Sequence, residues 1–481
     1  MNTALDHLEP KALWKHFAAL AAIPRGSGNE AAARRYVIDQ ATRLRLDFSE
    51  DSVGNLVVRK PARPGRDIAA TAALQGHLDM VNEKNEDTVH DFEKDPIRLV
   101  RDGDWLKADG TTLGADNGIG VASALAVMES TDIAHGRLEF VFTIDEERGL
   151  TGASNFAPGL LKAKYFLNLD GEEEGAICIG CAGGLSTVAR RKMTRQAAPR
   201  EAAWRIKVSG LKGGHSGVDI HLGRGNAVRV LGRVLDRSLE RLPAAIADMQ
   251  GGSKLNAIPR EASAIIVLDG REQELKSLVA EVETEVRAEL GTFDPGVQIT
   301  VTAADRPETV LEAADAKLVA GVLNCLPHGV IAMSPDVPGL VQTSTNIATV
   351  STGKDAVEIG TSQRSSIESS KMAIVGAVCN IFRLAGFEIQ HSGGYPGWKP
   401  EPNSELVQKL QAVHEQMFGK KAGLVAMHAG LECGVIGEKY PGMQMVSFGP
   451  QIENPHSPNE RLKISSVEPF WRFLTTVLER I

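Results

Sequence analysis

Cysteine is scarce in this chain, and its few cysteines do not suggest a disulfide framework. Five cysteines are spread over 481 residues, and such a sparse, odd set favours a reducing compartment. Cys178 and Cys181 form a CxxC pair. Neither a second CxxC nor a suitably spaced histidine pair accompanies it, which argues against a zinc ribbon. We interpret the pair as structural.

Long apolar runs and an excess of basic charge are also absent. No run reaches the ~18 apolar residues that a transmembrane helix needs, and the opening MNTALDHLEPKALWKHF lacks the apolar segment of a signal peptide. The formal charge of −8 disfavours nucleic acid and anionic membranes as partners, because binding them requires basic surface. We therefore expect a cytoplasmic protein that binds neither nucleic acid nor membrane.

The chain does contain the composition of a globular protein and more length than one core uses. Its 43% hydrophobic and 24% charged residues are ordinary values, and 481 residues predict two or three domains. Strands alternating with helices predict an α/β domain with a mixed central sheet flanked by helices, built from residues 1–185 and 392–481. Residues 186–391 read as an inserted α+β lid domain.

The stretch Leu138–Ala153, LEFVFTIDEERGLTGA, joins a buried strand to three consecutive carboxylates. Its alternating apolar residues indicate a strand, and Asp145, Glu146 and Glu147 follow where glycines mark a turn. An isolated acidic triplet is most often a solvated surface turn. At the end of a buried strand, however, desolvating adjacent carboxylates is costly unless a cation lies nearby. The stretch alone leaves both interpretations open.

Further acids and a histidine follow other predicted strands. His77 and Asp79 come after the strand Ala72–Gln75, and Asp170 comes after Tyr165–Leu169. In α/β sheets, ligands bind beyond the carboxyl ends of the strands. We therefore expect these side chains to converge on one crevice with the acids of the turn.

Two more residues have two interpretations each. Asp116 follows a glycine-rich turn and precedes an amphipathic helix, so it is either a helix N-cap or a member of the crevice. His456 lies in a proline-rich loop, where a lone histidine is usually solvated. It is also the late histidine that the cluster lacks.

Together these residues fit a site for two metal ions. Two ions about 3.5–4 Å apart need a bridging carboxylate and further ligands on each side. The hypothesis gives His77 and Asp170 to one ion, Glu147 and His456 to the other, and makes Asp116 the bridge. Imidazole and carboxylate ligands without thiolate suit two Zn²⁺ ions, with Co²⁺ or Mn²⁺ as alternatives.

Asp79 and Glu146 are not needed as ligands, and both can serve catalysis. A carboxylate two residues after a ligand histidine can orient that histidine, which is the role we predict for Asp79. A carboxylate beside a metal-activated water can take its proton and pass it to a leaving amine, which is the role we predict for Glu146. Asp145 has no predicted role.

Seven motifs resemble those of the aminoacyl-histidine dipeptidases, within the di-zinc peptidases that also include carnosinases, peptidase T, carboxypeptidase G and aminoacylases. The resemblance runs over nearly the whole chain, and its motifs are GHLDMV (Gly76–Val81), TTLGADNGIG (Thr111–Gly120), DEERGLTGA (Asp145–Ala153), NLDGEEEG (Asn168–Gly175), GCAGG (Gly180–Gly184), HAGLECG (His428–Gly434) and PHSPNE (Pro455–Glu460).

The resemblance implies a zinc-peptidase-like catalytic domain with a lid, and it implies the same ligand and catalytic residues. It also implies a cis peptide bond after Asp116. In the lid, it implies that His215 polarises the scissile carbonyl and that Asn256 and Arg364 lie near the substrate carboxylate, while Gly430 lines the pocket. Arg148 and Gly26 depart from the family pattern, which bears on substrate preference more than on the metal site.

The predicted function is therefore a metal-dependent dipeptidase acting on Xaa-His and related small dipeptides, and the resemblance allows a homodimer. One alternative is another amide hydrolase of the same fold, such as a tripeptidase or an N-acyl amino acid hydrolase. A protein that binds metal or peptide without catalysis is the alternative from another class. The presence of both Asp79 and Glu146 argues against it, because a binding site does not need them.

Overall fold

The chain forms two compact units, each with its own sheet. The computed structural model describes residues 3–199, 201–268 and 270–481. Unit 1 comprises Met1–Cys181, Trp398–Ala426 and Leu431–Ile481, and unit 2 comprises Ala182–Gly397 and Met427–Gly430.

The main segment of unit 2 runs from Ala182 to Gly397, where residues 186–391 were expected, and one further segment was not expected in this unit. The short segment Met427–Gly430 belongs to unit 2, although it falls within the stretch 392–481 expected in the catalytic domain. Two hydrogen bonds account for this. The Met427 carbonyl accepts the N–H of Ala182, and His428 Nε2 lies 2.7 Å from Ser344 Oγ.

Unit 1 is built around a mixed sheet, as predicted, and this sheet has eight strands. Its strand order is β1-β2-β6-β3-β7-β23-β8-β22, with β6, β3, β7 and β23 parallel to one another and the remaining registered pairs antiparallel. The strands are β1 (Asp47–Glu50), β2 (Leu56–Lys60), β3 (Ala72–His77), β6 (Leu138–Thr143), β7 (Tyr165–Asn168), β8 (Ala176–Cys181), β22 (Gly423–Met427) and β23 (Gln444–Ser447). A smaller sheet has the order β24-β25-β5-β4, from β24 (Ile452–Glu453), β25 (Arg461–Lys463), β5 (Trp105–Ala108) and β4 (Leu99–Asp102).

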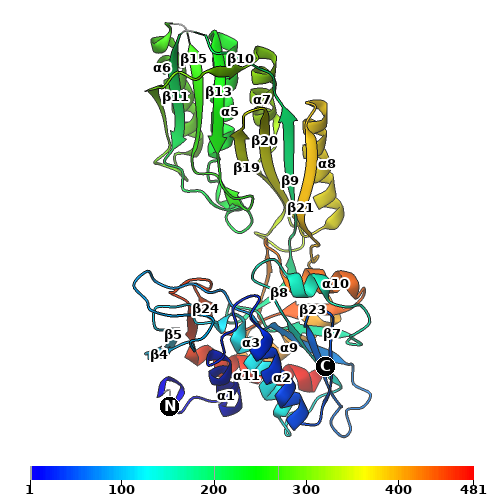
Figure 1. Cartoon of the computed structure of the whole chain (residues 1–481). Helices are drawn as coiled ribbons and strands as arrows, with labels where there is room; N and C mark the ends of the chain where they lie inside the picture. The colour runs from blue at the N-terminus through cyan, green and yellow to red at the C-terminus, as the bar shows by residue number, and fades with distance from the viewer. Residues whose placement is uncertain (1–2, 200, 269) are drawn as a thin grey trace. The chain divides into compact units, whose positions relative to one another are not determined.

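The helices of unit 1 cover this sheet. Helices α1 and α2 contact α3, which in turn contacts β3 (Figure 1). Every residue of α3 from Ala115 to Met128 is buried, which fits its small and apolar composition. The helices are α1 (Lys11–Ala21), α2 (Ala31–Arg43), α3 (Ala115–Glu129), α4 (Thr151–Asn155), α9 (Glu405–Phe418), α10 (Glu432–Lys439) and α11 (Ile464–Arg480), after a short 3₁₀ turn at Thr3–Leu5.

Unit 2 is an α+β unit with a nine-stranded sheet. The strand order is β16-β11-β15-β13-β19-β20-β9-β21, and β18 also pairs with β19. Apolar residues of α5, α6, α7 and α8 form one core with the sheet, including Val234, Val282 and Ile266. The strands are β9 (Gly183–Lys192), β11 (Ala202–Ser209), β13 (Ala244–Gly251), β15 (Ala262–Leu268), β16 (Gln298–Ala304), β18 (Gly329–Met333), β19 (Val341–Thr352), β20 (Ala356–Ser365) and β21 (Glu388–Tyr395). The helices are α5 (Ala227–Arg241), α6 (Glu272–Leu290), α7 (Ala313–Cys325) and α8 (Glu368–Leu384), and a 3₁₀ turn spans Ile220–Leu222.

Two short strand pairs complete unit 2. They are β10 (Arg195–Ala197) with β17 (Thr309–Leu311), and β12 (Gly214–His215) with β14 (Ala257–Ile258). The predicted fold class is confirmed, with an α/β unit carrying a mixed sheet and an α+β unit inserted in it. Among the described residues, none of the helices has both the length and the apolar composition needed to cross a bilayer.

Candidate metal centre and active site

The parallel strands of unit 1 bring their carboxyl ends to one edge of the sheet. His77 at the end of β3 pairs with Thr143 at the end of β6, and Gln75 pairs with Asn168 at the end of β7. β3 is buried along its whole length, as expected for a central parallel strand. The polar residues that end or follow these strands therefore meet at this edge.

Two glycines allow α3 to approach the same edge. A Cβ on Gly76 would lie 2.2 Å from Asn117 Oδ1, so any larger residue would displace the Asn117 side chain at the start of the helix. Gly114 has φ +68°, a left-handed conformation that ends the turn before the helix. The Asp116–Asn117 peptide bond is cis, as the family resemblance implies.

Asp116 lies between the two histidines of the cluster. Its Oδ1 is 3.0 Å from His77 Nε2, and its Oδ2 is 3.0 Å from His456 Nε2. On one side, His77 Nε2 is also 3.5 Å from Asp170 Oδ1. On the other side, His456 Nε2 is 2.9 Å from Glu147 Oε2. A carboxylate with one oxygen toward each half of a site has the geometry of a bridge.

The structure thus brings together all five residues predicted as metal ligands. Two triads could each hold an ion, one of His77, Asp116 and Asp170 and the other of Asp116, Glu147 and His456, with ligand atoms within 4.8 Å of one another. Glu147 Oε1 is buried and has no hydrogen-bond partner among the described residues. Clustered buried carboxylates facing imidazoles fit divalent cations of the zinc type.

The electrostatics of the cluster fit the same interpretation. Burial raises the pKa of Asp170 to about 6, and the charges of Asp116 and Glu147 add to this effect against that of His77. Hydrogen bonds with Asp116 and Glu147 raise the pKa of His456 to about 11. The carboxylates therefore repel one another and attract positive charge, which a bound cation would supply.

Asp79 is buried and holds two parts of the site together. Its Oδ1 lies 3.3 Å from His77 Nδ1, and its two oxygens accept the backbone N–H groups of Glu146 and Glu147 at 3.1 and 3.2 Å. Ser27 Oγ donates a further bond of 2.7 Å. Although burial opposes ionisation, the bonds from His77, Ser27 and Glu146 lower the pKa of Asp79 to about 2. An ionised Asp79 can orient the histidine as predicted.

Glu146 lies beside the cluster and forms a further group of potential ligands with His77 and Glu147. One of its carboxylate oxygens lies within 4.8 Å of ligand atoms of His77 and Glu147. Burial raises the pKa of Glu146 well above its usual 4.5, and the charges of Asp170, Glu432 and Glu147 add to the effect against that of His77. A carboxyl group with a raised pKa can hold and release a proton near neutrality.

Asp145, the third acid of the turn, has a structural role, because it bonds to residues on either side of the turn and to none of the five proposed ligands. It adopts a left-handed conformation with φ +51°. Its N–H donates to Glu30 Oε1 at 3.1 Å, and its Oδ1 accepts a bond of 2.5 Å from Arg148 Nε. Arg148, one of the two residues that depart from the family pattern, thus bonds to the first residue of the turn that carries Glu146 and Glu147.

The predicted substrate residues all lie in unit 2. His215 in β12 pairs with Ala257 in β14, and the carbonyl of Asn256 accepts the N–H of Ser216 at 2.8 Å. His215 Nδ1 accepts the N–H groups of residues 217 and 218, both at 3.2 Å. With Nδ1 accepting these N–H groups, the proton of a neutral ring would lie on Nε2, the atom that also faces Arg364 Nη2.

Arg364 lies next to this ring. Its Nη2 is 3.4 Å from His215 Nε2, and its Nη1 donates to Tyr395 Oη at 2.8 Å. Gly430 is in the same neighbourhood, because a Cβ there would lie 2.7 Å from Tyr395 Cε2. Burial and the charge of Arg364 lower the pKa of His215 against the charge of Asp219, which favours the neutral ring.

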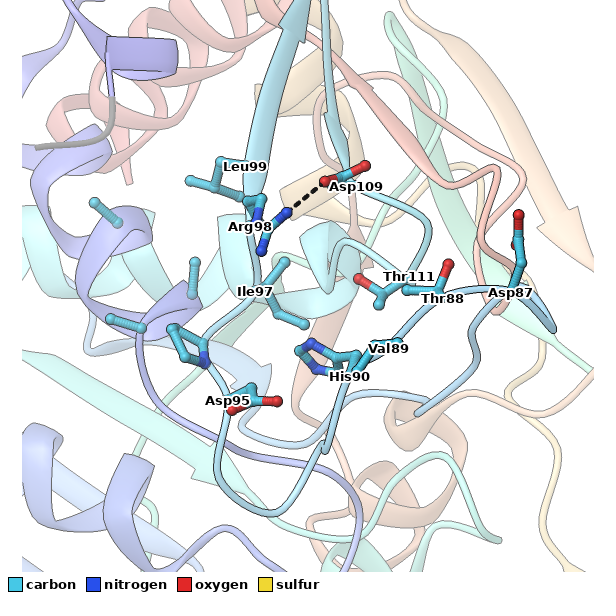
Figure 2. Close-up of a pocket in the computed structure, with 14 residues that line it drawn as sticks. Asp87, Thr88, Val89, His90, Asp95, Ile97, Arg98, Leu99, Asp109 and Thr111 are labelled. Atoms are coloured by element: carbon cyan, nitrogen blue, oxygen red, sulfur yellow. Dashed lines mark hydrogen bonds and ion pairs between the residues drawn. The ribbon is translucent and has the colours of Figure 1, made fainter.

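A large pocket of unit 1 lies apart from this chemistry. It has a volume of about 890 Å³, and Figure 2 shows side chains from the stretches 87–99 and 109–111 on its walls, with an ion pair of 2.8 Å between Arg98 and Asp109. None of its described lining residues belongs to the carboxylate–histidine cluster. The convergence of titratable groups, and not the size of the cavity, therefore identifies the candidate site.

Three buried charged residues near the site were not predicted. Arg25 hydrogen-bonds to the carbonyls of Leu78, Asp79 and Gly114. Glu460 accepts backbone N–H groups of the turn before α3. Glu432 accepts bonds from the side chains at positions 75 and 143. Both glutamates lie inside motifs that carry the family resemblance, and their burial was the missing signal.

These features indicate a class of protein. An α/β unit presents carboxylates and imidazoles in two triads that share the buried Asp116, beside further carboxylates able to move a proton. Such an arrangement fits a hydrolase that uses divalent cations. The family model described as "Peptidase family M20/M25/M40" matches residues 73–480. The chain therefore belongs to this family, whose members are metal-dependent peptidases.

Two relatives resemble this chain over nearly their whole length. The cytosol non-specific dipeptidase of Escherichia coli (strain K12) is 40% identical over 479 residues, 99% of each chain. The crystal structure of aminoacylhistidine dipeptidase from Vibrio alginolyticus has a TM-score of 0.93 and 42% identity, covering 99% of this chain and 98% of that one. The aminopeptidase PepT from Bacillus cereus, with 18% identity, a TM-score of 0.57 and coverage of 98% and 99%, shares the fold.

Proposed function

We propose that this protein is a metal-dependent dipeptidase that hydrolyses Xaa-His and related small dipeptides. The observation that supports this most is the position of Asp116 between His77 and His456, with Asp170 and Glu147 completing the two triads. The substrate class follows from the two full-length relatives, one named a non-specific dipeptidase and the other an aminoacylhistidine dipeptidase. The name of the first relative also supports a cytosolic location.

The proposed metal ligands are the five residues of the two triads, and the proposed metal is zinc, two ions per chain. When bound, such ions polarise the scissile carbonyl and make a water molecule more acidic. Asp116 would bridge, His77 and Asp170 would hold one ion, and Glu147 and His456 the other. Co²⁺ or Mn²⁺ would suit the same oxygen and nitrogen donors.

Proton transfer is assigned to Glu146. Its carboxylate would take a proton from the attacking water and deliver it to the amine that leaves when the peptide bond breaks. Asp79 would keep His77 in one orientation through its contact with Nδ1 and would hold the backbone of both glutamates.

Recognition of the substrate is assigned to unit 2. The Nε2–H of His215 would donate to the carbonyl oxygen as negative charge develops on it. The guanidinium of Arg364 would bind the free α-carboxylate of the dipeptide, with Asn256 and Gly430 nearby. Tyr395 joins this group because its phenol oxygen accepts a bond from Arg364.

The test is turnover after removal and return of metal. Purified protein is treated with a chelator and assayed with carnosine, other Xaa-His dipeptides, tripeptides and N-acetyl amino acids, with and without added Zn²⁺. We expect dipeptides to be hydrolysed only with metal. Preference for tripeptides or N-acyl amino acids would instead favour another amide hydrolase of this fold. Full activity after chelation would refute the metal mechanism, and no turnover of any substrate would favour a binding protein.

A further inference from the structure

Glu460 is a buried glutamate to which the proposed mechanism gives no task. It lies four residues after His456, and only 2% of its surface is exposed. Its carboxylate accepts four consecutive backbone N–H groups, those of Leu113, Gly114, Ala115 and Asp116, at 2.7, 2.9, 2.7 and 3.2 Å. A single side chain thus binds the whole turn that carries the bridging carboxylate.

These bonds do more than cap a helix. The first N–H groups of a helix have no partner within the helix, and a carboxylate beside them is favoured by the helix dipole. Here the bonds also join two distant segments, because Glu460 and His456 share one short loop. Any displacement of Glu460 would change the position of Asp116 relative to His456.

Arg25 makes the matching connection on the other side of the turn. It is 3% exposed, and its Nη1 donates to the carbonyls of Leu78 and Asp79 at 3.0 and 2.9 Å. Its Nη2 donates to the carbonyl of Gly114. The guanidinium therefore joins the end of β3, which carries His77, to the turn that carries Asp116.

The charge of Arg25 also suits this place. Glu460, Asp79, Asp116 and Glu147 are the acidic groups that favour its charged form against the effect of burial. A guanidinium keeps its charge when buried and has donors in a fixed planar fork. Arg25 therefore places a permanent positive charge beside the clustered carboxylates. Its hydrogen bonds go to backbone carbonyls, so it does not occupy the carboxylate oxygens that would bind a metal ion.

We propose that Arg25 and Glu460 are positioning residues that set the spacing of Asp116 from His77 and from His456, and thereby the affinity and geometry of the metal site. Neither residue is a ligand, and neither contacts reacting atoms. Arg25 fixes the distance on the His77 side and Glu460 fixes it on the His456 side. The inference rests on the proposed metal site, but not on the identity of the substrate.

A purely structural pair would give a different result. Loss of a buried bond that only stabilises the fold would lower the melting temperature of the metal-free protein and leave metal binding as it was. Loss of a positioning bond would weaken metal binding and alter the ligand field of a bound ion. Residues that support metal ligands in this way typically change metal affinity about 10- to 100-fold when replaced.

The experiment uses two conservative variants and two matched controls. Glu460→Gln keeps the size of the side chain but turns one acceptor oxygen into a donor that faces backbone N–H groups. Arg25→Lys keeps the charge but cannot reach three carbonyls with one fixed fork. The controls Glu468→Gln and Arg35→Lys make the same changes at exposed positions of α11 and α2.

Each full-length protein is stripped of metal and titrated with Co²⁺, followed by calorimetry and by the visible absorption of the bound ion. Melting of the metal-free proteins and kcat at saturating Co²⁺ are measured alongside. We expect both variants to bind Co²⁺ about 10- to 100-fold more weakly, with changed absorption bands and lower kcat, while the controls match wild type. Wild-type Co²⁺ affinity and spectrum in either variant would overturn the proposal, including when its melting temperature has fallen.

The Co²⁺ measurements separate this inference from the proposed function. If wild type binds two Co²⁺ ions but hydrolyses no dipeptide, the substrate assignment fails while the titration still decides the role of Arg25 and Glu460. If wild type binds no Co²⁺, the metal site itself is wrong and the positioning proposal falls with it. Should Glu460→Gln fail to fold, Arg25→Lys carries the same comparison.

Discussion

Asp79 Oδ1 lies 3.3 Å from His77 Nδ1, while the same carboxylate accepts the backbone N–H groups of both Glu146 and Glu147. One buried acid therefore controls the orientation of a proposed metal ligand and the path of the turn that carries two further site residues. Asp79 could not move to improve one contact without weakening the other.

The variant Asp79→Asn tests this double task. An amide has one acceptor oxygen, so its nitrogen must face a donor on one side of the site in either orientation. We expect Zn²⁺ affinity and kcat to fall about 10- to 100-fold. Metal content by mass spectrometry and kcat at saturating Zn²⁺ measure both effects. The control Asp67→Asn, at an exposed position, should match wild type, and an unchanged Asp79→Asn enzyme would contradict the assignment.

Much of the site was predictable because each residue belongs to a local pattern. His77 and Asp170 end or follow apolar strands, and the parallel order of β3, β6 and β7 places those ends at one edge. Asp116 and His456 each had two interpretations in the sequence. Their 3.0 Å contact is a relation between segments 340 residues apart, which no local pattern contains.

The buried charged residues that no sequence pattern predicted also connect segments that are distant in the sequence. Arg25 donates to carbonyls 53, 54 and 89 residues away in the sequence. Glu460 accepts the N–H of Leu113, which is 347 residues away. A charged residue in a polar loop normally predicts a solvated side chain. The position of Met427–Gly430 in unit 2 was unpredictable for the same reason, because this segment hydrogen-bonds to a residue distant in the sequence, Ser344.

The two neighbouring glutamates should separate in a metal analysis. Glu147 Oε2 is 2.9 Å from His456 Nε2, so Glu147→Ala should lose one of two ions. Glu146→Ala should keep both ions and lose about 10²- to 10⁴-fold in kcat, the usual contribution of a general base. Metal per chain and kcat are measured for each variant. The reverse pattern would mean that the roles of the two residues are exchanged.

Metal binding should release protons. Hydrogen bonds with Asp116 and Glu147 raise the pKa of His456 to about 11, and the net effect of burial and neighbouring acids raises that of His77 above its usual 6.5. Both rings are therefore protonated in the metal-free protein at pH 7, whereas a ligand imidazole must be neutral. Zn²⁺ titrations by calorimetry in buffers of different ionisation enthalpy count the protons. Equal heats in all buffers would contradict this, and His456→Ala should release fewer protons.

Activity should fall on acidification, and Glu432 should influence where the fall occurs. Glu146 must be ionised to accept a proton, so activity is present above its pKa and lost as the pH falls through it. Burial raises the pKa of Glu432 to about 7, and its charge in turn raises the pKa of Glu146. A flat profile between roughly pH 5 and 8 would contradict this assignment.

The variant Glu432→Gln removes that charge with little change of shape. Glu432 Oε2 accepts the bonds from Gln75 and Thr143, while Oε1 has no partner among the described residues, so a glutamine can keep both bonds. We expect the acidic limb of log kcat against pH to shift to lower pH by on the order of one unit. The control Glu438→Gln, exposed on the same helix, should not shift it, and a shift to higher pH would contradict the argument.

Arg364 should contribute to binding of the substrate carboxylate more than to the chemical step. The variant Arg364→Lys keeps the charge but loses the planar fork that binds a carboxylate through two bonds. A charge-assisted hydrogen bond is worth about 1.5–3 kcal/mol, so KM for Xaa-His dipeptides should rise about 10- to 100-fold with a smaller change in kcat. Tyr395→Phe, which removes the oxygen that accepts from Nη1, should raise KM in the same direction and more weakly.

Dipeptide amides, which lack the carboxylate, provide the control: wild type and Arg364→Lys should hydrolyse them with similar KM. An equal loss on acids and amides would place the effect of Arg364 elsewhere than on the carboxylate.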